Sequence, residues 1–218
     1  HDSLPISVLA WREPDYLPLL MTADLPELHD LPTYNWAEQF HDPAKSFVMQ
    51  MRAVVNAAAA RADCLPYLRA DTGVINGPSI FGVECIAPEH TKPVVSKPQD
   101  KRILKRFRVP EDIADMGIMM QLIQHTQHHL CTLEDYGLSE LVDVHHCDTQ
   151  GPFDIAHQVR GPDIFTDIYD DPDFFHHLMN EATRCFIQLS KFSKGMAGEG
   201  NWGNASGYWM ESGGIRIC

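Results

Sequence analysis

LVDVHHCDTQGPFDIAHQVRG, residues 141–161, contains the pattern of a strand, a polar turn and a helix in immediate succession. Val142 and Val144 alternate with polar neighbours, which is the two-residue period of a strand, and we expect that strand over 142–147. Gly151-Pro152 then interrupts the chain, and apolar residues return at helical spacing from Phe153 to Val159. The stretch therefore predicts one strand–helix unit of an α/β protein.

The polar end of this predicted strand is a candidate functional site. His146, Cys147, Asp148 and Gln150 follow the apolar residues directly, and α/β folds carry their active sites at the carboxyl ends of the strands. Alternation along a strand sends His145 and Cys147 to one side and His146 and Asp148 to the other. We take His146 and Asp148 as candidate catalytic residues and Gln150 as a candidate substrate-binding residue. A polar loop without a chemical role fits the same residues.

A second predicted strand, Cys64–Asp71, ends in the turn Thr72-Gly73 and leaves Asp71 at its carboxyl end. Asp71 is the leading candidate catalytic residue of the chain, although a turn cap would use the same side chain. Further strands are expected at Leu4–Ala10 and from Gly213 to Cys218. Strands that alternate with helices predict an α/β fold with parallel strands, either doubly wound or a barrel.

Two segments carry a family resemblance: TQGPFDIAHQVRG, residues 149–161, and DIYDDPDFFHHLMNEAT, residues 167–183. Their order resembles the uroporphyrinogen decarboxylase superfamily, which contains decarboxylases and cobalamin-dependent methyltransferases. The resemblance implies an α/β fold of the (β/α)₈ TIM barrel class. Such a barrel needs ~250 residues, so residues 1–218 are interpreted as a single domain that forms the N-terminal half of a barrel and is truncated at its C-terminal end.

The resemblance also implies roles for single residues. Asp71 takes the place of the decarboxylases' strand-end aspartate, which precedes a loop leading to Phe81-Gly82. Arg12 is the basic residue of the loop before Tyr16-Leu17-Pro18, where the family binds substrate carboxylates. His157 or Gln158 stands where the decarboxylases have a tyrosine. Arg12, His157 and Gln158 are therefore candidate substrate-binding residues.

The methyltransferases of this superfamily hold zinc through a His-x-Cys motif on a later strand and a further cysteine. His145-His146-Cys147 contains that motif on an earlier strand, so we do not transfer the zinc role to it. The metal ligands of this protein are unknown from the sequence, and we expect them after Cys218.

The resemblance favours methyl transfer from a corrinoid cofactor on a carrier protein to a thiol or a similar acceptor, with zinc in the full-length protein. One alternative is a decarboxylase of a tetrapyrrole or of a smaller carboxylic acid. Another is a non-catalytic barrel that binds a ligand. A homodimer is compatible with each.

Composition excludes several classes of partner. The net charge is −13, with 17 Lys+Arg against 30 Asp+Glu, which does not suit a protein that neutralises nucleic-acid phosphates. Neither an apolar run near ~20 residues nor a signal peptide is present, so we expect no membrane association and a cytoplasmic location. The six cysteines contain no CxxC pair and are expected to be reduced.

Helices are predicted from Asp42-Pro43 to about Ala62, from Met116 to about Leu133 with Asp115 as cap, and from Asp171-Pro172 to Gly195. Residues 21–40 are expected to lack regular structure. His125 and His129 have the spacing of two metal ligands on one helix face, but a solvated face is the favoured interpretation. The basic run 88–108 suits a solvated face or an anionic cofactor tail, and the solvated face is again favoured.

One prediction concerns substrate charge. Trp11 and Asp15 stand where the decarboxylases have two arginines, so a substrate with several carboxylates meets too little positive charge. We expect the full-length protein not to convert uroporphyrinogen at a useful rate. Incubation with uroporphyrinogen and product analysis checks this, and rapid stepwise decarboxylation would contradict it.

Overall fold

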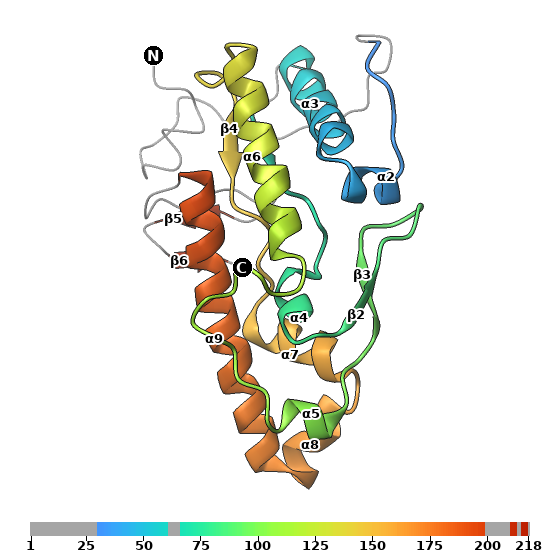
Figure 1. Ribbon diagram of the computed structural model, residues 1–218, viewed down its shortest axis with the longest axis vertical. Coiled ribbons are helices and arrows are strands. Elements are labelled where there is room, and N and C mark those ends of the chain that lie inside the picture. Colours follow the sequence, from blue (N-terminus) through green and yellow to red (C-terminus); the bar gives the residue numbers. More distant parts are fainter. Residues whose placement is uncertain (1–29, 61–65, 199–209, 213–214, 218) are drawn as a thin grey trace.

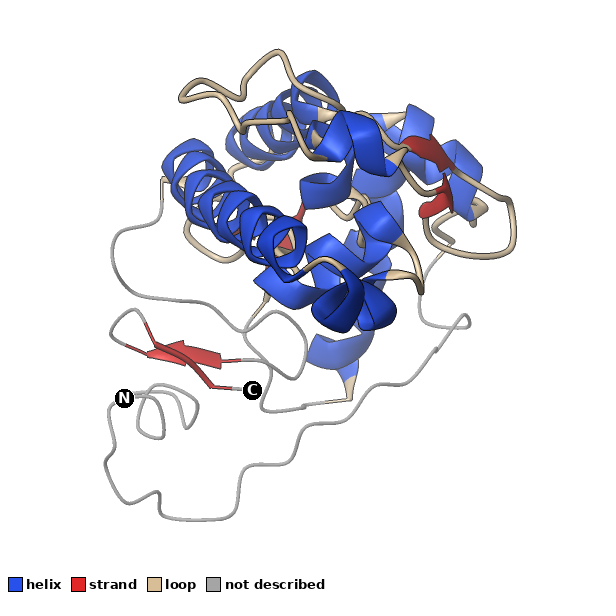
Figure 2. Cartoon of the chain, turned by 90° about the horizontal axis from the view of Figure 1, so that it is seen from below, coloured by secondary structure: helices blue, strands red, loops and turns tan. Residues whose placement is uncertain are grey.

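The computed structural model describes residues 30–60, 66–198, 210–212 and 215–217. The structure is rich in helix, and its strands are short (Figures 1 and 2). The helices are α2 (Trp36–His41), α3 (Pro43–Ala59), α4 (Asn76–Ile80), α5 (Lys101–Leu104), α6 (Met119–Asp135), α7 (Pro152–Arg160), α8 (Ile164–Asp170) and α9 (Pro172–Ala197). The strands are β1 (Tyr67–Arg69), β2 (Glu84–Ile86), β3 (Val94–Lys97), β4 (Asp143–His145), β5 (Met210–Ser212) and β6 (Ile215–Ile217).

Strands β1 and β4 form a parallel pair in which Leu68 lies opposite Val144 and Arg69 opposite His145. This confirms that two of the predicted strands run in parallel with their carboxyl ends at the same edge. Each strand is three residues long, shorter than predicted. Within the described residues the sheet has two strands, so the structure shows a mixed α/β architecture with a parallel pair and does not show a closed barrel.

The two outermost predicted strands have different outcomes. Leu4–Ala10 lies outside the described residues, as does Arg12. The prediction of a strand within 213–218 is confirmed by β6. Its partner among the described strands is β5, however, and the two pair antiparallel. The expectation of parallel pairing at this position is therefore wrong for the described strands, because Met210–Ser212, close by in the chain, supplies an antiparallel partner.

Helices α3 and α6 cover one face of the β1–β4 pair. Leu68 and Val144 are buried there together with Leu133, and Phe47 and Met51 of α3 pack against them. A larger core surrounds α9, whose buried residues Leu178, Ala182, Cys185 and Leu189 meet residues of α4 and α7. The face of the β1–β4 pair opposite α3 and α6 carries polar side chains.

Two predicted helix starts are confirmed in detail. Asp42 caps α3 by accepting hydrogen bonds from the backbone N–H groups of Ala44 and Lys45, and Pro43 follows it. Asp171 caps α9 through the N–H of Phe174. The sequence predicts these two helix starts correctly because an N-cap carboxylate and the proline that follows it act within one helical turn.

Other helix predictions are wrong. Helix α6 begins after Ile118 and not at Asp115, and α9 ends at Gly198, which has a left-handed φ of 72°, and not at Gly195. The residues predicted to lack regular structure contain α2, whose start is a capping box of Asn35 and Glu38. Ala58 of α3 and Leu130 of α6 are exposed, although both are apolar.

The interpretation of His125 and His129 as a solvated face is also wrong. Both side chains of α6 are buried, His125 at 1% and His129 at 0% exposure, because α6 turns this face towards α3. The ring of His129 lies 5.8 Å from that of Phe47. Burial lowers the pKa of His129 to about 3, with further lowering by His125 and His128.

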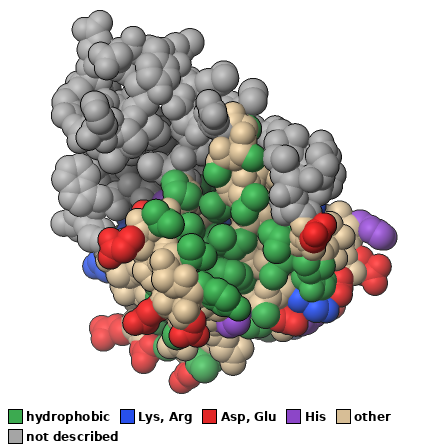
Figure 3. Space-filling view, turned by 90° about the horizontal axis from the view of Figure 1, so that it is seen from above, with side chains coloured by type: hydrophobic (Ala, Val, Ile, Leu, Met, Phe, Trp, Pro, Cys, Tyr) green, Lys and Arg blue, Asp and Glu red, His purple; other side chains and the backbone are tan. Residues whose placement is uncertain are grey.

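Among the described residues, apolar side chains are exposed near the start of β4. Figure 3 views the molecule from above, at the end where α6 ends and β4 begins, and shows apolar side chains in the middle of this face. Tyr136 and Leu141, which lie between the two elements, are 76% and 66% exposed. Among the described residues, no helix has both the length and the apolar character that a membrane span requires.

The burial of His129 predicts a pH-dependent stability. Within the described residues neither ring nitrogen of His129 has a hydrogen-bond partner. Its pKa is lower in the folded chain than the ~6.5 of an unfolded chain, so the unfolded chain binds the proton first as the pH falls. The free energy of unfolding should drop by up to ~1.4 kcal/mol per pH unit from about pH 6.5 down to about pH 3.

His129→Leu should raise the free energy of unfolding at pH 7 by ~1 kcal/mol or more, because a buried unpaired polar ring is removed. The variant should also flatten the pH dependence in chemical denaturation. His176→Leu, at an exposed position of α9, is the control. A less stable His129→Leu protein would show that this ring is satisfied in the fold.

Candidate functional site

The carboxyl ends of β1 and β4 carry the polar face of the strand pair. Leu68 and Val144 point towards α3 and α6, so the alternating residues Tyr67, Arg69 and His145 belong to the opposite face. The rings of Tyr67 and His145 stack with centroids 4.4 Å apart and planes 8° from parallel. Tyr67, Arg69 and His145 therefore form one polar surface beside the site predicted at the strand ends. The sequence did not predict that Tyr67 and Arg69 belong to it.

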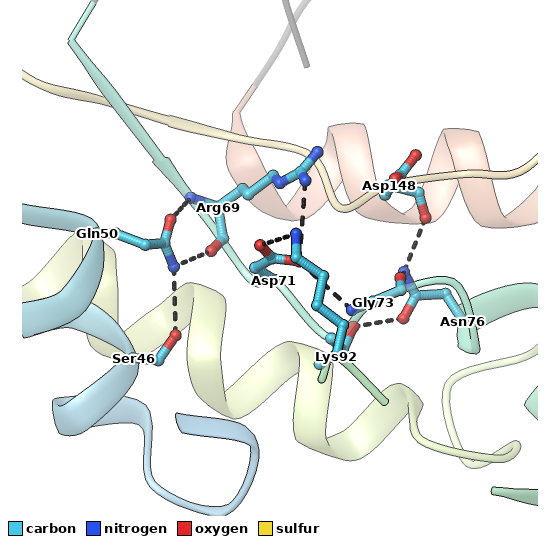
Figure 4. Close-up of polar contacts among 9 residues, drawn as sticks. Ser46, Gln50, Arg69, Asp71, Gly73, Asn76, Lys92 and Asp148 are labelled. Atoms are coloured by element: carbon cyan, nitrogen blue, oxygen red, sulfur yellow. Dashed lines mark hydrogen bonds and ion pairs between the residues drawn. The ribbon is translucent and has the colours of Figure 1, made fainter. Parts of the chain in front are cut away.

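Asp71 lies two residues beyond β1 and is held by two cations (Figure 4). Its Oδ2 accepts a 2.6 Å hydrogen bond from Lys92 Nζ. Its Oδ1 lies 3.8 Å from a guanidinium nitrogen of Arg69 and accepts a 3.4 Å hydrogen bond from the N–H of Gly73. Burial opposes ionisation of this carboxyl, but Arg69 and Lys92 outweigh it and lower its pKa. At neutral pH Asp71 is therefore a carboxylate and a weak base.

The strand of Arg69 is anchored by a side chain from α3. The carboxamide of Gln50 accepts a 2.7 Å hydrogen bond from the Arg69 N–H and donates a 2.6 Å hydrogen bond to the Arg69 C=O. These are the bonds that a neighbouring strand would make, so Gln50 serves as a strand neighbour at this residue. Ser46 Oγ accepts a further hydrogen bond from Gln50 Nε2, which orients the amide.

The loops after β1 and β4 are joined through Asn76. Its Nδ2 donates a 2.7 Å hydrogen bond to the backbone C=O of Asp148, and its Oδ1 accepts from the hydroxyl of Thr72. Asn76 is buried at 1% exposure, so these bonds form in a site with little water. The structure therefore brings the loops of Asp71 and Asp148 together, as the parallel arrangement predicted.

The other predicted site residues lie in different surroundings. His146 is buried at 3% exposure, and Asp148 and Gln150 are half-buried. On α7, His157 and Gln158 are also half-buried, and the His157 ring packs 5.4 Å from that of Phe165 on α8. Within the described part of the chain, the side chains of Asp148 and His157 make no hydrogen bond to Asp71. Whether they share a pocket with Asp71 stays a prediction.

Two lysines of the basic run are paired within the chain. Lys101 Nζ lies 2.6 Å from Asp167 and 3.2 Å from Asp171, and Lys105 Nζ lies 2.7 Å from Asp171. Asp167 is buried and also takes a 2.6 Å contact from Arg160. These pairs fasten α5 to α8 and to the start of α9. Lys101 therefore does not belong to a solvated face, because its ammonium group forms ion pairs with Asp167 and Asp171.

The described residues do not fit a zinc site. No group of three His, Cys, Asp or Glu side chains within the described part of the chain could hold a metal ion. Cys147 is buried at 3% exposure, and burial raises the pKa of its thiol to about 12, whereas zinc binds the thiolate. The described cysteines Cys85, Cys131, Cys147 and Cys185 form no disulfide.

The sequence matches no protein-family model. No curated protein matches it either. A methyltransferase from Methanosarcina mazei has a similar structure, with a TM-score of 0.65 and 17% sequence identity over 90% of this chain and 57% of that chain. At this identity the likeness shows the fold alone. The chain spans 57% of the length of that methyltransferase.

The anchor at Arg69 generates a prediction about stability. Gln50→Leu keeps the approximate size of the side chain but removes both hydrogen bonds to the Arg69 peptide, which should cost ~1–3 kcal/mol of unfolding free energy. Denaturant unfolding measures the loss. Gln127→Leu, at an exposed position of α6, is the control and should change stability little. Equal stability of the two variants would contradict the anchoring role of Gln50.

Proposed function

We propose that this chain belongs to a methyltransferase of the uroporphyrinogen decarboxylase superfamily. The enzyme would move a methyl group from a corrinoid cofactor, carried by a partner protein, to a thiol or a similar acceptor. The single observation that carries the proposal is the structural likeness, over 90% of the chain, to the methyltransferase from Methanosarcina mazei. The segments 149–161 and 167–183 support it independently, because they resemble the same superfamily in sequence.

The geometry around Asp71 supports a site at the strand ends. A carboxylate that is 17% exposed and contacted by Lys92 and Arg69 is set in place before any ligand arrives. Because its pKa is lowered, Asp71 suits the positioning of a substrate better than proton transfer at neutral pH. We assign it the role of a substrate-positioning carboxylate.

The proposed reaction also needs a thiol acceptor and a zinc ion. In such a reaction the acceptor thiol would lose its proton and its sulfur would bond to the methyl carbon, while the bond from that carbon to the corrinoid would break and leave its electron pair on the corrinoid. Zinc, when bound, would lower the pKa of that thiol. Since the described side chains do not fit a zinc site, we propose that its ligands follow Cys218, and no step is assigned to His145 or Cys147.

Asp71→Asn keeps the shape of the side chain and removes its charge, so the variant should lower turnover by ~10²-fold or more and leave the fold intact. The measurement is methyl transfer from methylcobalamin to a small thiol by the full-length protein, with circular dichroism to verify folding. The matched control is Asp143→Asn, since Asp143 is an exposed aspartate of β4.

Four outcomes test the proposal and its alternatives. Methyl transfer that depends on Asp71 and on stoichiometric zinc supports the proposal. Decarboxylation of a tetrapyrrole or of a smaller acid, without methyl transfer, identifies the decarboxylase alternative. Full methyl-transfer activity in Asp71→Asn would show that the site lies on other residues, and binding without turnover would identify a non-catalytic barrel.

A further inference from the structure

The hairpin formed by β2 and β3 has few attachments to the rest of the molecule. Its two strands pair antiparallel, and no third strand joins them among the described strands. Most of its strand residues are exposed or half-buried, and it lies at the edge of the molecule (Figures 1 and 2). A hairpin without a buried face is held by its ends and by single contacts.

The base of the hairpin is fixed. Gln99, just after β3, donates from Nε2 to the backbone C=O of Gly82 at 2.9 Å and to that of Phe81 at 3.3 Å. Its own N–H donates to the C=O of Val159 at 2.8 Å, which ties the base to α7. Gly82 has a φ of 72° and precedes β2, so the chain can pivot where few side chains crowd it.

The tip of the hairpin rests on the candidate site. Lys92, between the two strands, reaches Asp71 with Nζ 2.6 Å from Oδ2, and the same Nζ lies 5.1 Å from the ring centroid of Trp36. The N–H of Trp36 donates a 3.2 Å hydrogen bond to the C=O of Glu89. A Cβ added to Gly73 would lie 2.8 Å from the carbonyl oxygen of Pro93, so the tip packs directly on the turn after Asp71.

We propose that the β2–β3 hairpin is a movable strap over the candidate site, and that the ion pair between Lys92 and Asp71 is its latch. The base is tied by Gln99, whereas the tip is held by the ion pair of Lys92 with Asp71, by the hydrogen bond between Trp36 and Glu89, and by the packing of Pro93 on the turn at Gly73. Because the lysine end of the pair is 41% exposed, water can solvate its charge when the pair opens. A substrate group that contacts Asp71 must displace Lys92 or share the carboxylate with it.

Lys92 is thus a positioning residue that acts through Asp71. The inference rests on the proposed function in one respect, which is that Asp71 faces the substrate. The position of the strap itself is independent of the reaction, and its test needs neither substrate nor cofactor.

The Trp36 amide is a specific reporter of the docked tip, because its N–H bonds to Glu89. Hydrogen exchange of the full-length protein, read at this amide, should be roughly threefold to tenfold faster in Lys92→Met than in the wild type. Asp71→Asn should give a similar increase although it lies on another segment, and the double variant should add little to either. Lys92→Arg, which keeps the charge, should restore most of the protection.

Amides of α6 provide an internal reference, and Lys97→Met provides a matched control because Lys97 is an exposed lysine of β3 away from Asp71. Unchanged exchange at Trp36 in Lys92→Met and Asp71→Asn would overturn the latch, as would an equal increase in Lys97→Met. An equal increase at α6 would mark general destabilisation and also counts against the strap. Loss of methyl transfer in every assay would sink the proposed function but leave this result standing.

Discussion

The parallel pairing of β1 with β4 is the constraint on which the site depends. It aligns Arg69 with His145 and places two distant loops at one edge of the sheet. The packing of Leu68 and Val144 against α3 and α6 then decides which face is apolar, and the remaining face receives Tyr67, Arg69 and His145. A register shift of one residue would exchange these faces and dismantle the site.

Polar side chains supply backbone hydrogen bonds that the three-residue strands β1 and β4 do not make with each other. Gln50 satisfies the Arg69 peptide in place of a neighbouring strand, and Asn76 joins the loops through the Asp148 carbonyl. Further along the chain, Asp167 and Asp171 gather Lys101, Lys105 and Arg160. Two lysines of the basic run, Lys101 and Lys105, therefore help to fasten α5 to α8 and α9 in a chain of net charge −13.

Asp71 connects the proposed chemistry with the proposed strap. The same cations that keep it ionised, Arg69 and Lys92, come from different parts of the fold, one from the strand and one from the hairpin. Movement of the hairpin would change the charge around Asp71 at the moment a substrate enters. The proposed strap would therefore couple substrate admission to the electrostatics of the site through Lys92.

Local signals in the sequence were sufficient for several features. Asp42-Pro43, Asp171-Pro172 and Gly151-Pro152 mark the true starts of α3, α9 and α7, because capping and proline geometry act within one turn. Alternating residues predicted the position of β4, and the predicted strand before Asp71 contains β1, which ends two residues earlier, at Arg69. Segments 149–161 and 167–183 resemble a superfamily that contains methyltransferases, and the fold of the chain is similar to that of the methyltransferase from Methanosarcina mazei.

Tertiary structure alone decided the rest. His125 and His129 look polar in sequence but are buried, since the orientation of α6 depends on α3 and not on its own composition. Gln50 and Lys92 reach β1 and Asp71 from 19 and 21 residues away, and no local pattern distinguishes them from other surface residues. The roles of these residues arise from long-range contacts, which exist only after the strands have paired and the helices have packed against them.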